Sequence, residues 1–197
     1  MRLRKAVHAE AACRQLCMTI DPGVGAATGM DTLRDMSEHP SITHFRSELT
    51  RLGGRGRIVV LPDSVHTAAL AAEALDCEVG AIANSLLFSA MTASTGETKP
   101  VLILTSGAHR VDLAKVTAGI GVGALTRATP EFVREHTGQV IGGVSPIAHP
   151  HPIRTFLDPA LQEYEQLWAG AGHPAAVFST TYVELLAMTG AEEIAVN

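Results

Sequence analysis

The chain has few aromatic residues and few cysteines. Aromatics make up 4% of its 197 residues, so the core has to be built from Ala, Val, Leu and Ile. The cysteines are Cys13, Cys17 and Cys77, an odd number that does not fit the disulfide framework of a small secreted protein. The sequence therefore predicts a reducing, cytoplasmic location.

The chain also lacks an excess of positive charge and a long apolar run. Its formal net charge is −5, which argues against a DNA-binding protein that relies on bulk electrostatics, although a local basic rim could still guide an RNA end. No uninterrupted apolar run approaches the roughly 20 residues of a membrane span. The length fits one sizeable domain.

The first 36 residues differ from the rest in charge and pattern. They carry five basic and four acidic residues (5 − 4 = +1), whereas the remainder carries 10 basic and 16 acidic residues (10 − 16 = −6). A short basic helix over residues 1–18 would be broken at residues 21–25, and charged and polar residues interrupt the apolar segment that a signal peptide needs. We expect a loosely ordered extension over residues 1–36, with a transit peptide or sequence upstream of a later start as alternatives. One domain is expected over residues 37–197.

Regular secondary-structure signals begin near Arg57. Residues 57–61 read as a strand, and residues 84–89 and 101–105 read as a hairpin joined by the polar turn 94–97. Further short strands are expected at 124–127, 153–157, 175–179 and 193–196.

Helix starts are marked by capping residues and by proline at the first helical position. The expected helices are 65–75 capped by Ser64 or Thr67, 112–118 capped by Asp112, 129–138 opened by Thr129-Pro130, 160–167 opened by Asp158-Pro159, and 181–190 opened by the capping box Thr181–Glu184. Strands and helices mix without strict β-α-β alternation. The sequence thus predicts an α+β fold with a curved, mixed β-sheet flanked by helices.

The segment Gly142-Gly143-Val144-Ser145-Pro146 is the densest cluster of conformationally special residues. Two adjacent glycines let the backbone take positive φ and approach a ligand closely, and Pro146 fixes the far end. Such a loop can turn successive N–H groups toward one point, as an anion or oxyanion site requires. An ordinary tight turn is the alternative.

Nucleophilic and metal chemistry find little support. There is no Gly-x-Ser-x-Gly elbow, and Cys77 reads as a partly buried packing residue. His149 and His151 would share one face of an extended segment, with His109, His136 or His173 as a third ligand, but no zinc-binding spacing is present. A rigid surface turn is the favoured explanation of these histidines.

Several segments in register resemble the YbaK/EbsC family, whose members are relatives of the editing domain inserted in bacterial prolyl-tRNA synthetases. The resemblance runs from about Val65 to Val196. It is carried by residues 67–75, 80–88, 101–107 and 110–115, by the family's Gly-x-x-x-Pro loop at Gly142–Pro146, and by 171–173 with 181–190.

This resemblance implies hydrolysis of the ester between a small wrong amino acid and tRNA, with a barrel-like curved sheet and no metal or cofactor. Backbone N–H groups of the loop would hold the substrate carbonyl, and a neighbouring ribose hydroxyl would assist attack by water. The implied catalytic residues are Gly142, Gly143, Val144 and Ser145. The implied substrate-binding residues are Asn84, Thr67, Ser106, Gly107, Pro146 and His173. The acceptor end of an aminoacyl-tRNA would be the partner, together with an aminoacyl-tRNA synthetase.

The sequence departs from the family at Asn84, where many members carry a lysine. Asparagine keeps hydrogen bonding but loses the charge, which weakens a phosphate contact. Two further hypotheses therefore remain open: a non-catalytic RNA- or synthetase-binding module of the same fold, and a metal-dependent hydrolase that uses the histidines.

Overall fold

The computed structural model describes residues 39–62 and 67–197. The extension expected over residues 1–36 lies outside these residues, as does Ser64, one of the two helix caps considered above. Among the described residues, no helix is both long enough and apolar enough to cross a bilayer.

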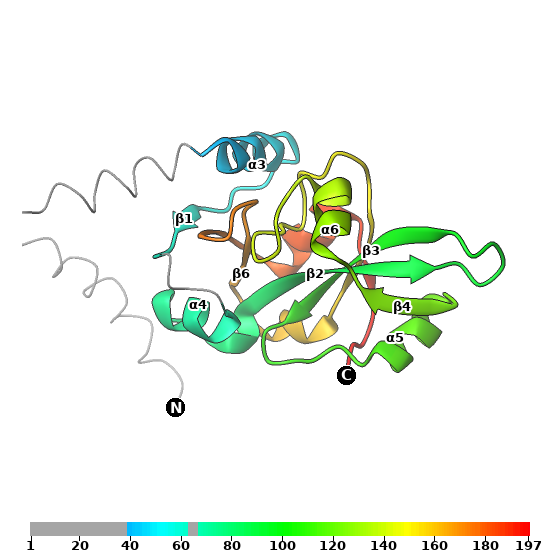
Figure 1. Cartoon of the computed structure of the whole chain (residues 1–197). Coiled ribbons are helices and arrows are strands. Elements are labelled where there is room, and N and C mark those ends of the chain that lie inside the picture. The colour runs from blue at the N-terminus through cyan, green and yellow to red at the C-terminus, as the bar shows by residue number, and fades with distance from the viewer. Residues whose placement is uncertain (1–38, 63–66) are drawn as a thin grey trace, which may run out of the picture. The chain divides into compact units, whose positions relative to one another are not determined.

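Strands and short helices alternate irregularly along the chain (Figure 1). The helices are α3 (Pro40–Arg51), α4 (Ala68–Ala74), η1 (Val79–Ala81), α5 (Leu113–Ile120), α6 (Pro130–Thr137), η2 (Pro159–Glu163) and α7 (Tyr182–Thr189). The strands are β1 (Ile58–Val60), β2 (Ile82–Met91), β3 (Thr98–Ser106), β4 (Ala124–Arg127), β5 (Arg154–Leu157), β6 (Leu167–Gly170), β7 (Ala176–Thr180) and β8 (Glu192–Glu193).

The described strands form one eight-stranded mixed sheet. Its order is β1-β7-β6-β2-β3-β5-β8, and β4 adds to β2 beside this path. Strand β2 runs parallel to β6 but antiparallel to β3 and β4, while β5 runs parallel to β3. This confirms the α+β fold with a mixed sheet. The end strands β1 and β8 do not pair with each other in the described chain, so the sheet is open, and barrel-like describes only its curvature.

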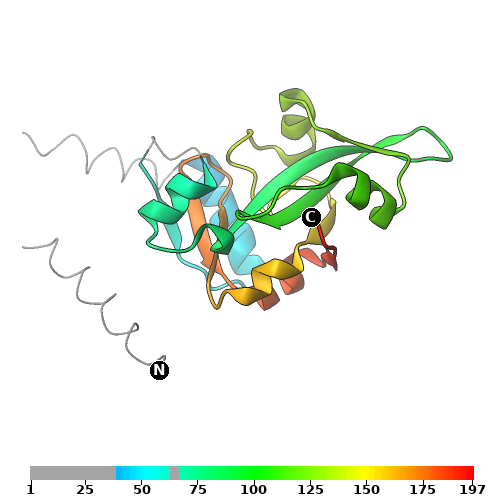
Figure 2. The ribbon, with the colours of Figure 1, turned by 90° about the horizontal axis from the view of Figure 1, so that it is seen from below.

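The hairpin of β2 and β3 is the longest pairing in the sheet, and its tip projects beyond the neighbouring elements (Figure 2). Nine residue pairs join the two strands, from Ala83 with Ser106 to Met91 with Thr98. The prediction of a hairpin is confirmed, although both strands are longer than expected.

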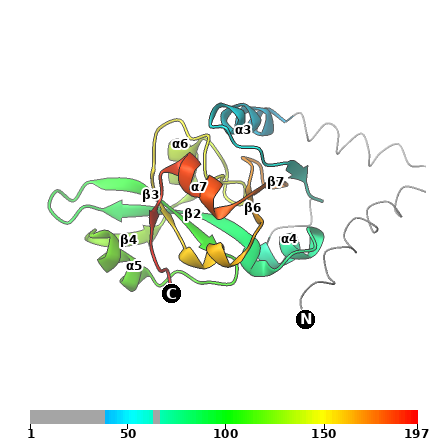
Figure 3. The same ribbon diagram turned by 180° about the vertical axis from the view of Figure 1, so that it is seen from behind.

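The apolar core is divided by the sheet. One face carries a large cluster that includes Phe45 of α3, Val133 of α6 and Leu185 of α7, which lies across this face (Figure 3). The other face carries two separate clusters. The α5 cluster contains Phe88, Ala90, Val101, Ile103, Val116, Ile120, Leu125, Phe156 and Val196. The α4 cluster contains Leu61, Ala71, Ala72, Ile82 and Trp168.

Most predicted helix caps are confirmed. Thr67 caps α4, Asp112 caps α5, Thr129 caps α6, and Thr181 forms a capping box with Glu184 at the start of α7. Gly121, Gly138 and Gly190 end their helices in the left-handed conformation, which favours glycine. Helix α5 continues to Ile120, two residues past its predicted end.

The predicted helix over residues 160–167 is wrong. Asp158 and Pro159 open only a short 3-10 helix, η2, and Leu167 already begins strand β6. Asp158 accepts the N–H of Ala160, a contact that a 3-10 turn and an α-helix share, so the start signal does not fix the length. The final strand is also shorter than expected, and helix α3 was not predicted.

Candidate active site

The outer edge of β2 has a gap in its strand pairing. Strand β6 pairs with β2 only at Ile82 and Ala83, and β4 pairs with it from Phe88 onward. Within the described chain, no strand pairs with residues 84–86 on this edge, so Asn84 lies where the sheet is locally open. Figure 1 shows this stretch of β2 running between α4 and α5.

Four residues form a row across strands β6, β2, β3 and β5: Gly170, Asn84, Thr105 and Asp158. Ala83 pairs with Ala169 in parallel, which brings the next residue, Gly170, beside Asn84. Asn84 pairs with Thr105, and Asp158 follows β5 beside Thr105, donating its N–H to the Leu104 carbonyl at 2.9 Å. Since strands are spaced by about 4.8 Å, this cross-strand row extends over roughly 14 Å.

The cross-strand row lies on the face that carries the α4 and α5 clusters, and it separates them. Thr105 Oγ1 lies 3.3 Å from Asp158 Oδ2, which places both side chains on this face. Ile82 of the α4 cluster and Phe88 of the α5 cluster lie on the same face of β2 as Asn84, two residues before it and four after it. Leu86, between the clusters, is exposed. The row is therefore a polar strip between two apolar ones.

The Gly142–Pro146 loop meets the row at Gly170. A Cβ atom at Gly170 would lie 2.6 Å from the Val144 carbonyl oxygen, and one at Gly143 would lie 2.7 Å from the backbone of His173 and Pro174. Such distances leave no room for a side chain at either glycine. The loop thus lies between the end of β6 and the His173-Pro174 segment. Two of the predicted site regions, the loop and His173, are therefore neighbours in the structure.

The loop uses two of its N–H groups internally. The Gly143 N–H donates to the Val140 carbonyl at 2.9 Å, and the Ser145 N–H donates to Gln139 Oε1 at 2.7 Å. Within the described residues, the N–H groups of Gly142 and Val144 make no hydrogen bond. Gly142 is exposed and has a φ of 87°, a value that favours glycine. These are the two donors of the loop without a partner in the described chain, one at an exposed residue and one at the buried Val144.

Ser145 holds the loop from inside. Its side chain is fully buried, and its Oγ accepts from Gln139 Nε2 at 2.8 Å and donates to the Ile147 carbonyl. His149 Nε2 lies 2.9 Å from the Ser145 carbonyl oxygen, and burial lowers the pKa of this histidine although the hydrogen bond opposes the shift. A hydroxyl so engaged fixes the loop and is not available as a nucleophile.

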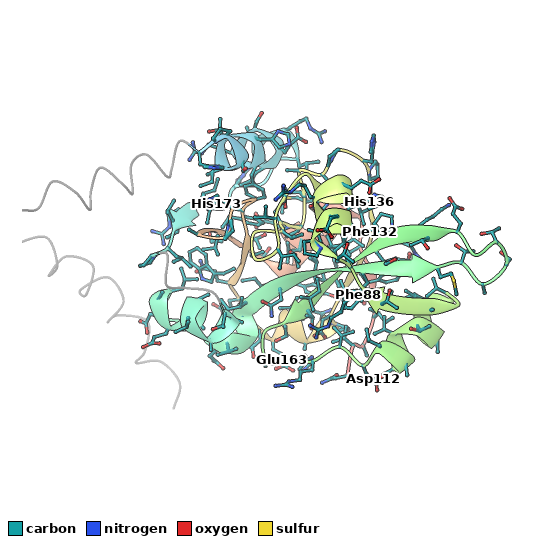
Figure 4. The ribbon with its side chains drawn as sticks, in the orientation of Figure 1. Phe88, Asp112, Phe132, His136, Glu163 and His173 are labelled. Atoms are coloured by element: carbon teal, nitrogen blue, oxygen red, sulfur yellow. The ribbon has the colours of Figure 1, made fainter. Side chains whose placement is uncertain are left out.

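The other predicted site residues differ in their surroundings. His173 lies beside α3 (Figure 4), with its ring 4.5 Å from that of His39 and its Nδ1 accepting the Ala175 N–H. Ser106 Oγ donates to the Gly80 carbonyl at 2.9 Å, and a Cβ atom at Gly107 would lie 2.3 Å from the Val79 carbonyl oxygen. Thr67 caps α4, and Pro146 is buried next to Ser145. Among these substrate-binding predictions, Asn84 is the one in the cross-strand row.

Much of the chain has counterparts among known proteins. Residues 62–188 match the family model described as the aminoacyl-tRNA editing domain. The chain belongs to this family. The resemblance to YbaK-type proteins noted from the sequence is thereby confirmed.

Three relatives of this editing domain illustrate its range. A solved structure named as a candidate trans-editing enzyme for prolyl tRNA synthetase is 43% identical, superposes with a TM-score of 0.73, and matches 80% of this chain and 97% of its own. The uncharacterized protein YwhH of Bacillus subtilis (strain 168) is 27% identical over 145 residues, which are 74% of this chain and 88% of YwhH. A proline--tRNA ligase of Levilactobacillus brevis is 27% identical over 107 residues, which are 54% of this chain but 18% of the ligase.

This editing domain contains a histidine–aspartate pair that no sequence pattern indicates. His109 Nδ1 lies 2.7 Å from Asp158 Oδ2, although the two residues are 49 positions apart. Asp158 is nearly fully buried and also accepts the Ser106 N–H at 3.2 Å. The sequence pattern indicates Asp158 only as a helix cap, and it carries no signal of the contact with His109.

The histidines and the cysteine of the editing domain do not form a metal site in the part of the chain that the structure describes. No three His, Cys, Asp or Glu side chains there are grouped closely enough to hold an ion. Cys77 is partly buried against the core, and desolvation, with Asp76 and Glu78 nearby, raises the pKa of its thiol. The interpretation of Cys77 as a packing residue is confirmed.

A cavity of about 650 Å³ lies between α3 and residues 137–150. Gln139 and His149 line it, and both also hold Ser145. His44, Glu48 and Arg51 line its α3 side, where Glu48 and Arg51 are paired at 2.8 Å. The charges at this wall therefore largely cancel.

Proposed function

We propose that this editing domain hydrolyses the ester that joins a small, wrongly attached amino acid to the acceptor end of a tRNA. The observation that carries the proposal is the pair of unengaged N–H groups at Gly142 and Val144, in a loop that meets the row containing Asn84. Membership of the aminoacyl-tRNA editing domain family supports the same reaction.

The reaction needs stabilised charge more than it needs a side-chain nucleophile. Water adds to the ester carbonyl carbon, the carbonyl oxygen becomes negative, and the bond to the ribose oxygen then breaks. The proton lost by water is balanced by the proton that the leaving ribose oxygen gains, with the neighbouring ribose hydroxyl assisting the transfer. One preorganised N–H donor contributes roughly 3 kcal/mol to such a transition state.

The loop residues divide into donors and supports. Gly142 and Val144 supply the N–H groups that receive the oxyanion. Gly143, Ser145 and Pro146 keep these donors in place, because their own polar groups and packing are directed into the protein. Asn84 hydrogen-bonds the aminoacyl-adenosine end with a neutral side chain, where many relatives carry a lysine.

The relatives favour a particular starting substrate. Because one relative is named for trans-editing with prolyl tRNA synthetase and another is a proline--tRNA ligase, the tRNA that accepts proline is the first candidate. The resemblance to the family implies a small pocket, which favours Ala, Ser, Thr, Cys or a similar non-protein amino acid on that tRNA. We propose that the reaction takes place in the cytoplasm and without a metal.

The test is a panel of labelled aminoacyl-tRNAs, incubated with the full chain in the presence and absence of a chelator. We expect release of one or a few small amino acids, at a rate that the chelator does not change. Tight binding without release would establish a non-catalytic module instead. Loss of activity with chelator, restored by zinc, would establish a metal-dependent hydrolase.

A further inference from the structure

The pair His109–Asp158 lies at the end of the cross-strand row opposite the Gly142–Pro146 loop. Asp158 Oδ2 receives three contacts, from His109 Nδ1 at 2.7 Å, from the Ser106 N–H at 3.2 Å and from Thr105 Oγ1 at 3.3 Å. The Asp158 side chain is 3% exposed, whereas that of His109 is 25% exposed. The carboxylate is therefore a buried anchor, and the imidazole is the part that reaches the surface.

The anchor determines which nitrogen of His109 is left for a ligand. A carboxylate only accepts hydrogen bonds, so in the neutral imidazole Nδ1 carries the proton and Nε2 is an acceptor. Nε2 makes no hydrogen bond within the described residues. An acceptor held in one orientation at a partly open position is suited to a ligand that offers an N–H or O–H donor.

The length of the row indicates which part of a substrate reaches this acceptor. The loop meets the row at Gly170, where the Val144 carbonyl approaches, and Asp158 lies three strand spacings away, roughly 14 Å along the row. With the ester at the loop, the ribose hydroxyls lie next to the ester and cannot extend that far. The exocyclic amine of the terminal adenine, at the far end of the nucleoside, is the donor that can.

The row lies between two buried apolar clusters. The α4 cluster, with Trp168 and Ile82, flanks one side, and the α5 cluster, with Phe88, flanks the other. Figure 4 labels Phe88 and Asp112, which mark the α5 side. Between the clusters, Leu86 is exposed on the same face as Asn84, so an apolar side chain and polar groups lie side by side where a flat, amphipathic ligand could make contact.

We propose that His109, oriented by Asp158, reads the 3′-terminal adenine of the tRNA by accepting a hydrogen bond from its exocyclic amine. This inference rests on the proposed function for the position of the ester. It places the aminoacyl-adenosine over the accessible part of the row, at Gly170 and Asn84, with the base at the His109 ring, which covers the buried Asp158.

The test measures binding, so that it does not depend on turnover. Acceptor-stem minihelices that carry the aminoacyl group through a stable amide end either in adenosine or in purine riboside, which lacks only the exocyclic amine. The full chain and the variants His109→Ala and His109→Gln are titrated with both ligands. His151→Ala, at an exposed histidine, is the matched control.

We expect the wild type and His151→Ala to bind the adenosine ligand three- to tenfold more tightly than the purine riboside ligand, as one net hydrogen bond predicts. His109→Ala should bind the adenosine ligand more weakly than the wild type does, by about the same factor. It should bind the purine riboside ligand as tightly as the wild type does. Equal wild-type binding of both ligands would overturn the inference. It would also be overturned if the His109 variants still preferred adenosine to purine riboside by the wild-type factor, because the two losses of affinity would then be independent. Because the wild-type comparison needs no mutation, a folding defect cannot mask the result. Hydrolysis is measured in a separate assay, so failure of the proposed function is distinguishable from failure of this inference.

Discussion

Gln139 and Ser145 are joined by reciprocal hydrogen bonds: Gln139 Oε1 accepts the Ser145 N–H at 2.7 Å, and Gln139 Nε2 donates to Ser145 Oγ at 2.8 Å. Both side chains are buried, so the amide satisfies two groups that water does not reach. The glycine loop is thus fixed to the end of α6 by one side chain.

Replacing that side chain should destabilise the domain and slow the reaction. In Gln139→Leu the Ser145 N–H loses its partner while buried, which costs about 1–3 kcal/mol in the free energy of unfolding. Urea denaturation measures this cost, and the deacylation rate should fall with it because the loop loses its support. Gln166→Leu, at an exposed glutamine, is the control and should change neither quantity.

The two glycines of the loop should respond differently to alanine. Gly143→Ala places a methyl group 2.7 Å from the backbone of His173 and Pro174, so the loop must shift and the deacylation rate should fall roughly 10²-fold, as for a lost oxyanion donor. Gly142→Ala has space but a φ of 87°, so its main cost is backbone strain of about 1–2 kcal/mol. Gly96→Ala carries similar strain at a φ of 67° in the hairpin turn and should leave the rate unchanged. A normal rate in folded Gly143→Ala would place the active site elsewhere.

Asn84 allows a test of the missing family lysine. Asn84→Ala should lower kcat/KM by roughly 1–2 kcal/mol, the cost of leaving a polar substrate group unpaired. Asn84→Lys should tighten tRNA binding at low salt and steepen its salt dependence by about one phosphate contact. Rates and salt slopes equal to those of the wild type in both variants would make Asn84 a structural residue.

His149 should make stability fall on acidification. Burial lowers its pKa in the folded state below the ordinary 6.5, so the unfolded chain takes up a proton first as the pH falls. The contribution is complete above about pH 6.5 and is lost as the pH falls toward the folded-state pKa. Urea denaturation between pH 7.5 and 5.5 should show a shallower decline for His149→Gln than for the wild type. His151→Gln, two residues further on and exposed, should keep the wild-type decline.

Local signals predicted the parts of the fold that depend on neighbouring residues. Thr129-Pro130 and the capping box of Thr181 specify helix starts within a few residues, and the structure confirms both. The helix expected after Pro159 is shorter because Leu167 and Trp168 lie in β6, which pairs with β7 and β2. Local propensity carries no information on such pairing.

The candidate site was predictable only in part for the same reason. The Gly142–Pro146 loop is visible in the sequence because adjacent glycines and a proline are unusual. The cross-strand row is not visible, since β6 reaches β2 through a parallel pairing more than 80 residues away along the chain. The contact between His109 and Asp158 depends on that topology and carries no local pattern.

The separation of the α4 and α5 clusters has a consequence for how the substrate selectivity of this domain can evolve. A substitution at the half-buried Asn84 alters the strip between the clusters without removing atoms from either, so it opens no cavity in the packed interior. Selectivity for the attached amino acid or the terminal base can therefore drift at small cost to folding. The same scaffold can serve different mischarged substrates while its helices and their packing stay as they are.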